Sequence, residues 1–262
     1  MSDDKRARMI ARVRRLLAVA ENSGATDEER QTFAAAAASL MARYDLTEAI
    51  VRAEQNKQPE PVESWNLEVP GTGGFGKARA WALGDIAEAY GCECAYRHND
   101  AGVLPRLVLI VGTASDLAAL RILLPPIAAQ MEHAALTSVR AHLAKLREWG
   151  RWAPAEIRRE RSGYINSFLT AYGHGVAEKI RQRRQQITND LTTSSTGAEL
   201  VLADRSNRVH AEFRRRFPNL RRARPIGRRS NAGSTDGYAQ GLRAHLPGND
   251  LTTDTRKQLP RD

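Results

Sequence analysis

The sequence lacks an apolar run long enough to cross a bilayer, and its N-terminus does not resemble a secretory leader. The opening residues, MSDDKRARMIARVRR, are charged and precede no long apolar stretch, so we expect neither a membrane span nor a signal peptide. The two cysteines, Cys92 and Cys94, are one residue apart, which is a poor spacing for a structural disulfide. Together these absences predict a soluble protein of the cytoplasm.

Catalytic motifs are also absent or incomplete. Residues 71–77 read GTGGFGK, which matches the phosphate-binding loop G-x-x-x-x-G-K-[ST] except at its last position. Ala78 stands where the loop needs a hydroxyl to ligate Mg²⁺, and no carboxylate directly follows the next apolar strand to hold that metal. The glycines instead indicate a flexible joint. We therefore predict that the chain is not an enzyme and has no catalytic residue and no cofactor.

The candidate metal ligands do not have the spacing of a metal site. Cys92 and Cys94 are closer together than the C-x₂₋₄-C spacing that zinc sites favour, and His98 adds only a third ligand. His133 and His142 are nine residues apart and so out of register for one face of a helix. We therefore expect half-buried strand cysteines and no bound metal.

Positive charge is concentrated in one part of the chain. The net charge is +10 at pH 7, and residues 140–230 hold 21 basic against 8 acidic side chains, a local balance of +13. Such a segment is typical of a surface that meets nucleic acid or an acidic partner. The alternative is a helical protein whose solvated faces happen to use arginine.

The candidate binding residues are arginines at helix ends and in one flexible arm. They are Arg158, Arg159 and Arg161 at the start of one helix, Arg181, Arg183 and Arg184 near its end, Arg214, Arg215 and Arg216 at the end of the next helix, and Arg221, Arg222, Arg224, Arg228 and Arg229 in an arm that also contains Pro and Gly. Arms of this kind enter a minor groove or track phosphates. The helix macrodipole offers a structural explanation for the cations at helix C-termini, but not for the arm.

Hydrophobic periodicity predicts a mostly helical α+β protein. Residues 1–55 read as an N-terminal helical hairpin, whose second helix begins at the capping box Thr26–Glu29. Residues 56–76 are polar and rich in proline and glycine, and we expect a flexible linker there.

An α-β-β-α unit with a small antiparallel sheet is predicted for residues 77–150, followed by a basic helical region over 151–246 and a disordered tail over 247–262. The expected elements are a helix over 77–90, strands over 92–98 and 106–111, a helix to residue 149 that Pro125-Pro126 interrupts, long helices over 154–187 and 198–217, a polar loop over 188–197, and a short helix over 235–246.

The N-terminal hairpin resembles the family known as domain of unknown function 2786. The family pattern is a helix ending in KLL-A-LA-E, a short acidic turn, and a helix ending in A-LMA-Y-L. The matching positions are Leu16, Leu17, Ala20, Glu21, Ala36, Leu40, Met41, Ala42, Tyr44 and Leu46. The chain from about Lys77 to Leu246 is similar to the domain that commonly follows this hairpin. The shared stretches are V-G-T-x-x-D from Val111 to Asp116, SF-x₃-Y-G-x-G-V-A from Ser167 to Ala177, and D-x-Y-x-x-G from Asp236 to Gly241.

Proteins of this family are typical of actinobacteria and their phages. In its general build the chain is similar to the recombination directionality factors that partner large serine integrases in the bacterial host cell. That resemblance implies a protein that binds the integrase, largely through the integrase's coiled-coil region, and switches it from integration to excision. The alternative is a direct DNA-binding regulator that uses the basic arm and the helix ends.

Overall fold

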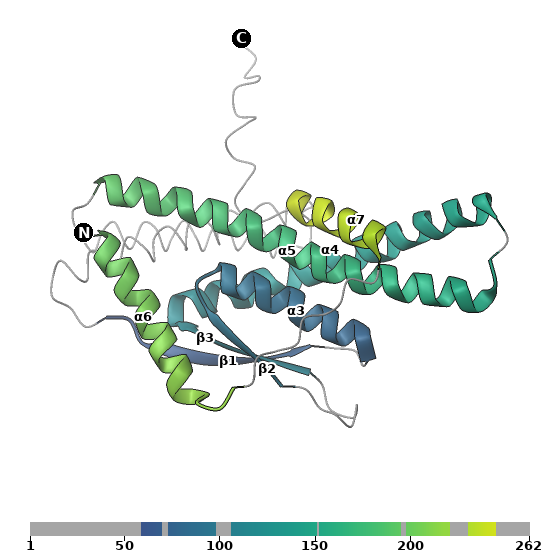
Figure 1. Ribbon diagram of the computed structural model, residues 1–262. Helices are drawn as coiled ribbons and strands as arrows, with labels where there is room; N and C mark the ends of the chain where they lie inside the picture. The colour runs from purple at the N-terminus through teal and green to yellow at the C-terminus, as the bar shows by residue number, and fades with distance from the viewer. Residues whose placement is uncertain are drawn as a thin grey trace, which may run out of the picture.

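The computed structural model describes residues 59–69, 73–97, 106–150, 152–194, 198–220 and 230–244. Most of these residues are helical, and their strands form a small antiparallel sheet, which confirms the predicted mostly helical α+β class (Figure 1). The helical hairpin predicted for residues 1–55 and the tail predicted for residues 247–262 lie outside the described residues. No helix in the described part is both long and apolar enough to span a membrane.

The sheet has three strands in the order β1-β3-β2, and both pairs are antiparallel. The strands are β1 (Val62–Val69), β2 (Glu93–Arg97) and β3 (Arg106–Thr113). In the central strand Ile110 lies opposite Trp65 of β1 and Cys94 of β2, so these three side chains share one face. Strands β2 and β3 were predicted; β1 was not.

The segment predicted as a linker contains β1 and the first turn of a helix. Trp65, Leu67 and Val69 occupy alternate positions and face the main core, which is the period of a half-buried strand. The nearby prolines and acidic residues obscured this pattern in the sequence. Helix α3 (Gly73–Ala89) then begins four residues before Lys77, so Gly73 to Gly76 belong to a helix and do not form the predicted joint.

Helix α4 (Ala114–Trp149) runs through Pro125 and Pro126 without the predicted interruption. Pro125 is exposed, whereas Leu124 and Ile127 on either side of the proline pair are buried. Tertiary packing of these apolar side chains holds both halves in one helix despite the backbone hydrogen bonds that proline removes.

Helix α5 (Pro154–Ser194) extends into the predicted polar loop and is followed by α6 (Ala198–Arg216) and α7 (Asn231–Arg243). Residues 188–196 are mostly polar, and several are threonines. Each threonine is only about 0.7 kcal/mol or less worse than alanine in a helix. Between Ile187 and Gly197 the sequence has no glycine or proline, so no helix-breaking residue ends the helix at Ile187.

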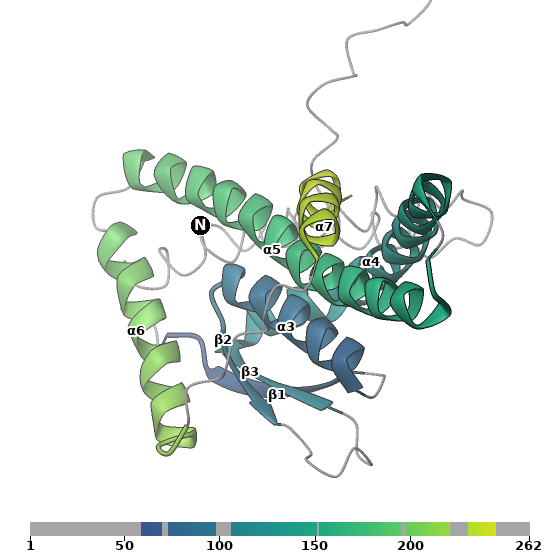
Figure 2. The ribbon, with the colours of Figure 1, turned by 45° about the vertical axis from the view of Figure 1, so that its right-hand side comes forward.

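The helices cover the two faces of the sheet unequally (Figures 1 and 2). Helix α3 lies on one face, α5 crosses α3, and α7 lies on α5, with α4 packed alongside. Ile86 of α3, Ile110 of β3 and Phe168 of α5 are fully buried in this main core. On the opposite face, α6 covers a second, smaller apolar cluster through Val209 and Phe213.

Helix α7 packs on α5 through glycines spaced four residues apart. A Cβ added at Gly233, Gly237 or Gly241 would lie 2.4, 2.3 or 2.2 Å from a backbone carbonyl oxygen of α5. These distances are far below van der Waals contact, so only glycine allows the two backbones to approach this closely. The Tyr164 hydroxyl also donates a hydrogen bond to the Asp236 carboxylate, at 2.5 Å. The middle of α5 is therefore fixed by backbone-to-backbone packing.

Candidate interaction surface

The predicted arginines separate into different environments along the chain. The structure describes Arg158, Arg159, Arg161, Arg181, Arg183, Arg184, Arg214, Arg215 and Arg216. The arm residues Arg221, Arg222, Arg224, Arg228 and Arg229 lie outside the described residues. The three helical groups lie at the start of α5, toward the end of α5, and at the end of α6, so the fold does not bring them into one patch (Figure 1).

The first group lies where α4 and α5 meet, at an end of the helical pair that projects beyond the sheet (Figures 1 and 2). We call this region, residues 140–162, the hairpin end. Arg158, Arg159 and Arg161 are exposed there, and within the described residues none of the three makes an ion pair. The end of α4 adds three more exposed cations, which are Arg140, Lys145 and Arg147, and one exposed acid, Glu148, so the cations outnumber it. The hairpin end therefore presents unneutralised positive charge.

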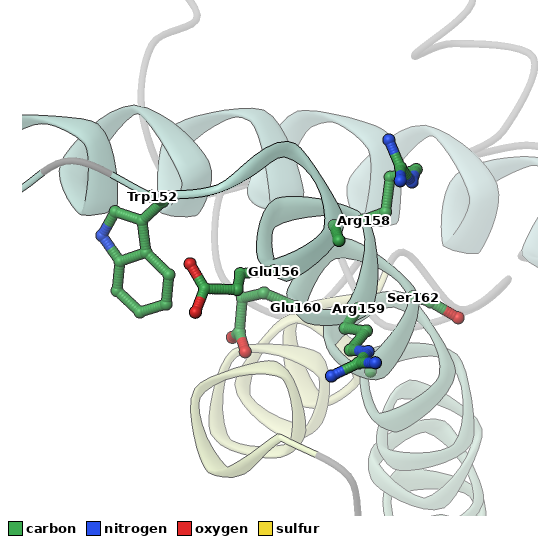
Figure 3. Close-up of a pocket in the computed structure, with 8 residues that line it drawn as sticks. Trp152, Glu156, Arg158, Arg159, Glu160 and Ser162 are labelled. Atoms are coloured by element: carbon green, nitrogen blue, oxygen red, sulfur yellow. The ribbon is translucent and has the colours of Figure 1, made fainter.

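The same region exposes two tryptophans. Trp149, the last residue of α4, is 83% exposed, and Trp152, just before α5, is 42% exposed. Trp152 borders an open hollow of about 730 Å³, whose other walls include Glu156, Arg159 and Glu160 (Figure 3). Large exposed apolar side chains beside arginines are typical of protein interaction sites.

The hairpin end is held in place by contacts between its two helices. His142 of α4 lies 2.8 Å from a carboxylate oxygen of Glu160 on α5, and its ring stacks on Tyr164 with centroids 4.6 Å apart. At the start of α5, the backbone N–H of Ala153 donates to the Glu156 carboxylate at 2.8 Å. This is half of a capping box, and Pro154 suits the first helical position. The exposed side chains thus stand on an ordered scaffold.

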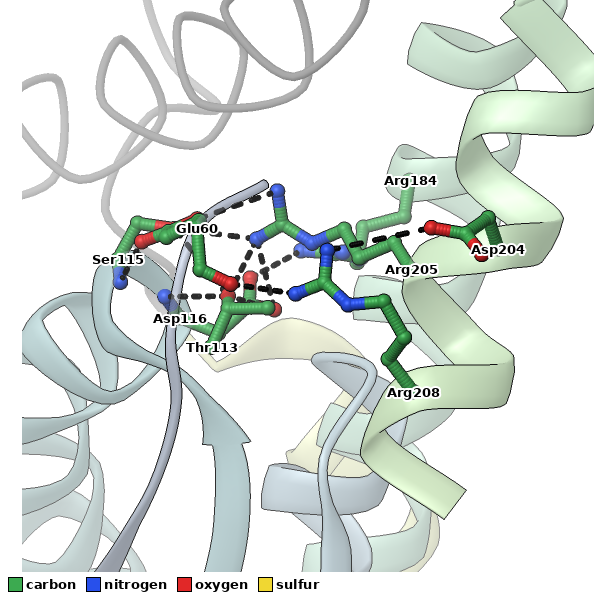
Figure 4. A network of polar contacts seen from close by, with 8 residues as sticks. All are labelled: Glu60, Thr113, Ser115, Asp116, Arg184, Asp204, Arg205 and Arg208. Carbon is green, nitrogen blue, oxygen red and sulfur yellow. Dashed lines mark hydrogen bonds and ion pairs between the residues drawn. The ribbon is translucent and has the colours of Figure 1, made fainter. Parts of the chain in front are cut away.

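Of the arginines toward the end of α5, Arg184 is occupied inside the protein. Arg184 lies 3.4 Å from Asp116 of α4, and its guanidinium lies 5.1 Å from the ring centroid of Tyr90. Arg205 of α6 approaches the other oxygen of Asp116 at 2.9 Å (Figure 4). The Asp116 side chain is only 5% exposed, and a carboxylate this deeply buried needs such partners.

The network continues to the segment that precedes β1 (Figure 4). Arg205 donates to the hydroxyls of Thr113 and Ser115 at 2.6 and 3.0 Å, and Thr113 caps the start of α4. The Ser115 N–H donates to the Glu60 carboxylate at 2.6 Å, and Arg208 donates to the Glu60 backbone carbonyl. This buried network therefore ties together α4, α5, α6 and the approach to β1.

These contacts change the interpretation of the second arginine group. Arg184 is part of the fold's internal ion network and is not presented to a partner. Arg181 pairs with Asp85 of α3 at 2.7 Å and is only partly exposed, whereas Arg183 is exposed. The sequence could not reveal these roles, because the partners Asp85 and Asp116 are far away along the chain.

The third group, at the end of α6, is exposed but shares its charge with a nearby acid. Arg215 and Arg216 both pair with Glu212, at 2.7 and 2.5 Å, and these hydrogen bonds lower the pKa of Glu212 to about 2. Arg214 donates to His210, which itself pairs with Glu93 of β2. Compared with the hairpin end, this cluster is partly neutralised.

Only Cys94 is the half-buried strand cysteine that the sequence predicts; Cys92 directly precedes β2 and is buried. The Cys94 thiol donates to the Gly84 carbonyl at 3.7 Å. Burial raises the pKa of both thiols well above the usual value. Among the described residues, no group of three or more His, Cys, Asp or Glu side chains could hold a metal ion. His98 lies outside those residues.

Sequence reasoning missed the tryptophans and the cations of α4. The signal was available in the stretch Trp149-Gly-Arg-Trp152, which places two large apolar residues at the turn between two long helical patterns. An aromatic pair at a helix-helix turn has no core face to join, so its exposure was foreseeable.

Comparison with known proteins supports a resemblance at the N-terminus. Residues 8–48 match the model of the family described as "Protein of unknown function (DUF2786)". The match supports the resemblance drawn from the N-terminal hairpin, and it covers residues outside the described part of the structure. No curated protein and no solved structure matches the chain.

Proposed function

We propose that this chain is a non-enzymatic accessory protein that acts on a DNA–protein complex of a phage or an actinobacterium. The observation that supports the proposal is the hairpin end, where Arg158, Arg159 and Arg161 stand exposed and unpaired on a scaffold fixed by the rest of the fold. Positive potential on a projecting element favours encounter with an acidic partner or with DNA held by that partner.

The specific form of the proposal is a recombination directionality factor. Such a factor binds a serine integrase and switches it from integration to excision. It does so by binding one arrangement of the integrase–DNA complex more tightly than another, because a ligand shifts an equilibrium only through differential affinity. The support for this form is the similarity in general build noted from the sequence.

A recombination assay tests this form directly. The purified protein is added to the serine integrase encoded by the same genome, with DNA substrates for integration and for excision in separate reactions. We expect excision to appear and integration to decline as the protein is titrated. Unchanged yields in both reactions would rule out directionality control.

A second candidate is a direct DNA-binding regulator. The exposed end of α6 favours it, because Arg214, Arg215 and Arg216 precede the arginines of residues 221–229 in the sequence. Gel-shift titration over a series of salt concentrations separates the two candidates. Tight binding to bare duplex DNA that falls steeply with salt supports the regulator. Binding only when integrase is present supports the accessory protein.

A further inference from the structure

We propose that Trp149 and Trp152 anchor the hairpin end in a groove of a partner protein that combines an apolar floor with an acidic rim. This inference rests on the proposed function, since it names the surface by which an accessory protein would hold its DNA-bound partner. The occupant is a protein, and duplex or single-stranded DNA is the alternative that the experiment addresses.

Both indoles at the hairpin end are exposed. An indole is the largest apolar side chain, and leaving most of one in water is unfavourable. Trp149 is 83% exposed although α4 buries apolar side chains one turn or two turns earlier, such as Leu143. Trp152 lies between the end of α4 and the start of α5 and borders the hollow next to Glu156 (Figure 3). Tryptophan and arginine are the residues most enriched among binding hot spots.

Both indoles are attached to the ends of ordered helices. Trp149 ends a 36-residue helix, and Trp152 precedes a helix whose first turn is capped by Glu156. The contact between His142 and Glu160 joins these helices close to the tip. A partner would therefore meet a surface that loses little conformational freedom on binding.

The charge around the indoles is mainly positive. The surrounding cations are Arg140, Lys145, Arg147, Arg158, Arg159 and Arg161. Three acids accompany these six cations: Glu148 is exposed, Glu156 accepts from the Ala153 N–H, and Glu160 lies against His142. The net field at the hairpin end is positive, so its complement is an acidic rim.

These features together favour a protein over nucleic acid. Phosphates of duplex DNA are contacted by cationic and polar side chains and by backbone N–H groups, none of which requires an exposed indole, and an undistorted stacked duplex offers no apolar groove for one. Single-stranded nucleic acid would stack its bases on aromatic rings, which makes it the alternative to exclude.

Fluorine NMR with 5-fluorotryptophan tests the proposal in the full chain. The four tryptophans give four resonances, and Trp149→Phe and Trp152→Phe variants assign the two at the hairpin end. The probe is the unlabelled serine integrase of the same genome, bound to its attachment-site DNA. We expect the resonances of Trp149 and Trp152 to shift or broaden on complex formation, and those of Trp65 and Trp81 to stay.

An affinity measurement gives the second readout. The Trp149→Ala/Trp152→Ala double variant should bind the integrase–DNA complex at least about tenfold more weakly, with unchanged melting temperature. Leu200→Ala is the matched control, because Leu200 of α6 is 77% exposed and lies elsewhere; its affinity should not change.

The outcomes separate the two proposals. If the wild-type chain binds the complex but the two resonances and the double variant's affinity do not change, the docking proposal fails and the accessory function stands. If the attachment-site duplex alone, or a single-stranded oligonucleotide alone, shifts the two resonances, the partner class is wrong. If the chain neither binds integrase nor alters recombination, both proposals fail.

Discussion

Helix α5 carries three arginines near its start and three over residues 181–184, and the two groups differ in their ion pairing. The first three, Arg158, Arg159 and Arg161, are all exposed and unpaired within the described residues. Two of the second three, Arg181 and Arg184, are paired with carboxylates of α3 and α4 inside the fold. Local positive charge in the sequence therefore does not identify a binding surface by itself. The acidic side chains that the fold brings near each arginine determine whether that arginine is exposed to a partner.

The sharpest test of this contrast is Arg184→Ala. The change leaves the buried Asp116 with Arg205 as its remaining ionic partner and removes the contact with Tyr90. We expect the free energy of unfolding to fall by about 3 kcal/mol, because breaking a buried pair leaves charge poorly compensated. Urea denaturation measures it. Arg158→Ala is the control and should stay within about 0.5 kcal/mol of wild type; equal losses would remove the distinction.

The middle of α5 offers a comparison of a different kind. Gly237→Ala places a Cβ 2.3 Å from the Phe168 carbonyl oxygen, so α7 must move away from α5. We expect a destabilisation of about 2 kcal/mol, opposite in sign to the gain of up to about 1 kcal/mol that alanine gives in an open helix. Thermal unfolding checks the sign. A stabilised Gly237→Ala protein would show that α7 does not pack on α5 as described.

A smaller effect on stability is expected from the ionisation of Glu88, whose charge interacts with that of Arg181. Although Glu88 is exposed, desolvation of its carboxyl group by the packed neighbours, followed by the carboxylates of Asp85 and Glu93, raises its pKa from 4.5 to about 7, and Arg181 opposes this shift. The folded state thus binds this proton more tightly than the unfolded chain, so the associated stability is present below about pH 4.5 and is lost as the pH rises through 7.

Glu88→Gln tests this pH dependence. The neutral amide cannot ionise, so the variant should melt at a higher temperature than wild type at pH 8 and differ less from it at pH 5. Arg181→Ala should have the opposite effect at pH 8, because it removes the opposing cation. If Glu88→Gln and wild type differed in melting temperature by the same amount at pH 5 and pH 8, Glu88 would not titrate in this range.

The smallest effect on stability is expected at the hairpin end. Replacing Arg158, Arg159 and Arg161 together by serine should leave the melting temperature within a few degrees of wild type, because these side chains make no ion pair in the described structure. A large loss of stability would mean that the three arginines belong to the fold, as Arg184 does.

Local patterns in the sequence predicted much of this fold and little of its polar chemistry. Strands β2 and β3 and the starts of α5 and α6 follow from periodicity and punctuation. Strand β1 was missed because its alternation is brief and follows prolines. The glycines of α7 form a periodic sequence feature, but their role depends on the carbonyls of α5 that they meet. The roles of Arg184 and Arg205 depend on Asp116, which only the folded chain brings near.

We propose that the arginines of the hairpin end, and not the other arginine groups, bind the partner. The direct measurement compares the Arg158→Ser/Arg159→Ser/Arg161→Ser variant with an Arg214→Ser/Arg215→Ser/Arg216→Ser variant for affinity to the integrase–DNA complex. The account predicts a loss of about tenfold, or 1.4 kcal/mol, for the first variant and a loss of less than about twofold for the second. Full affinity of the first variant together with a large loss in the second would contradict the account and favour direct DNA binding through the end of α6.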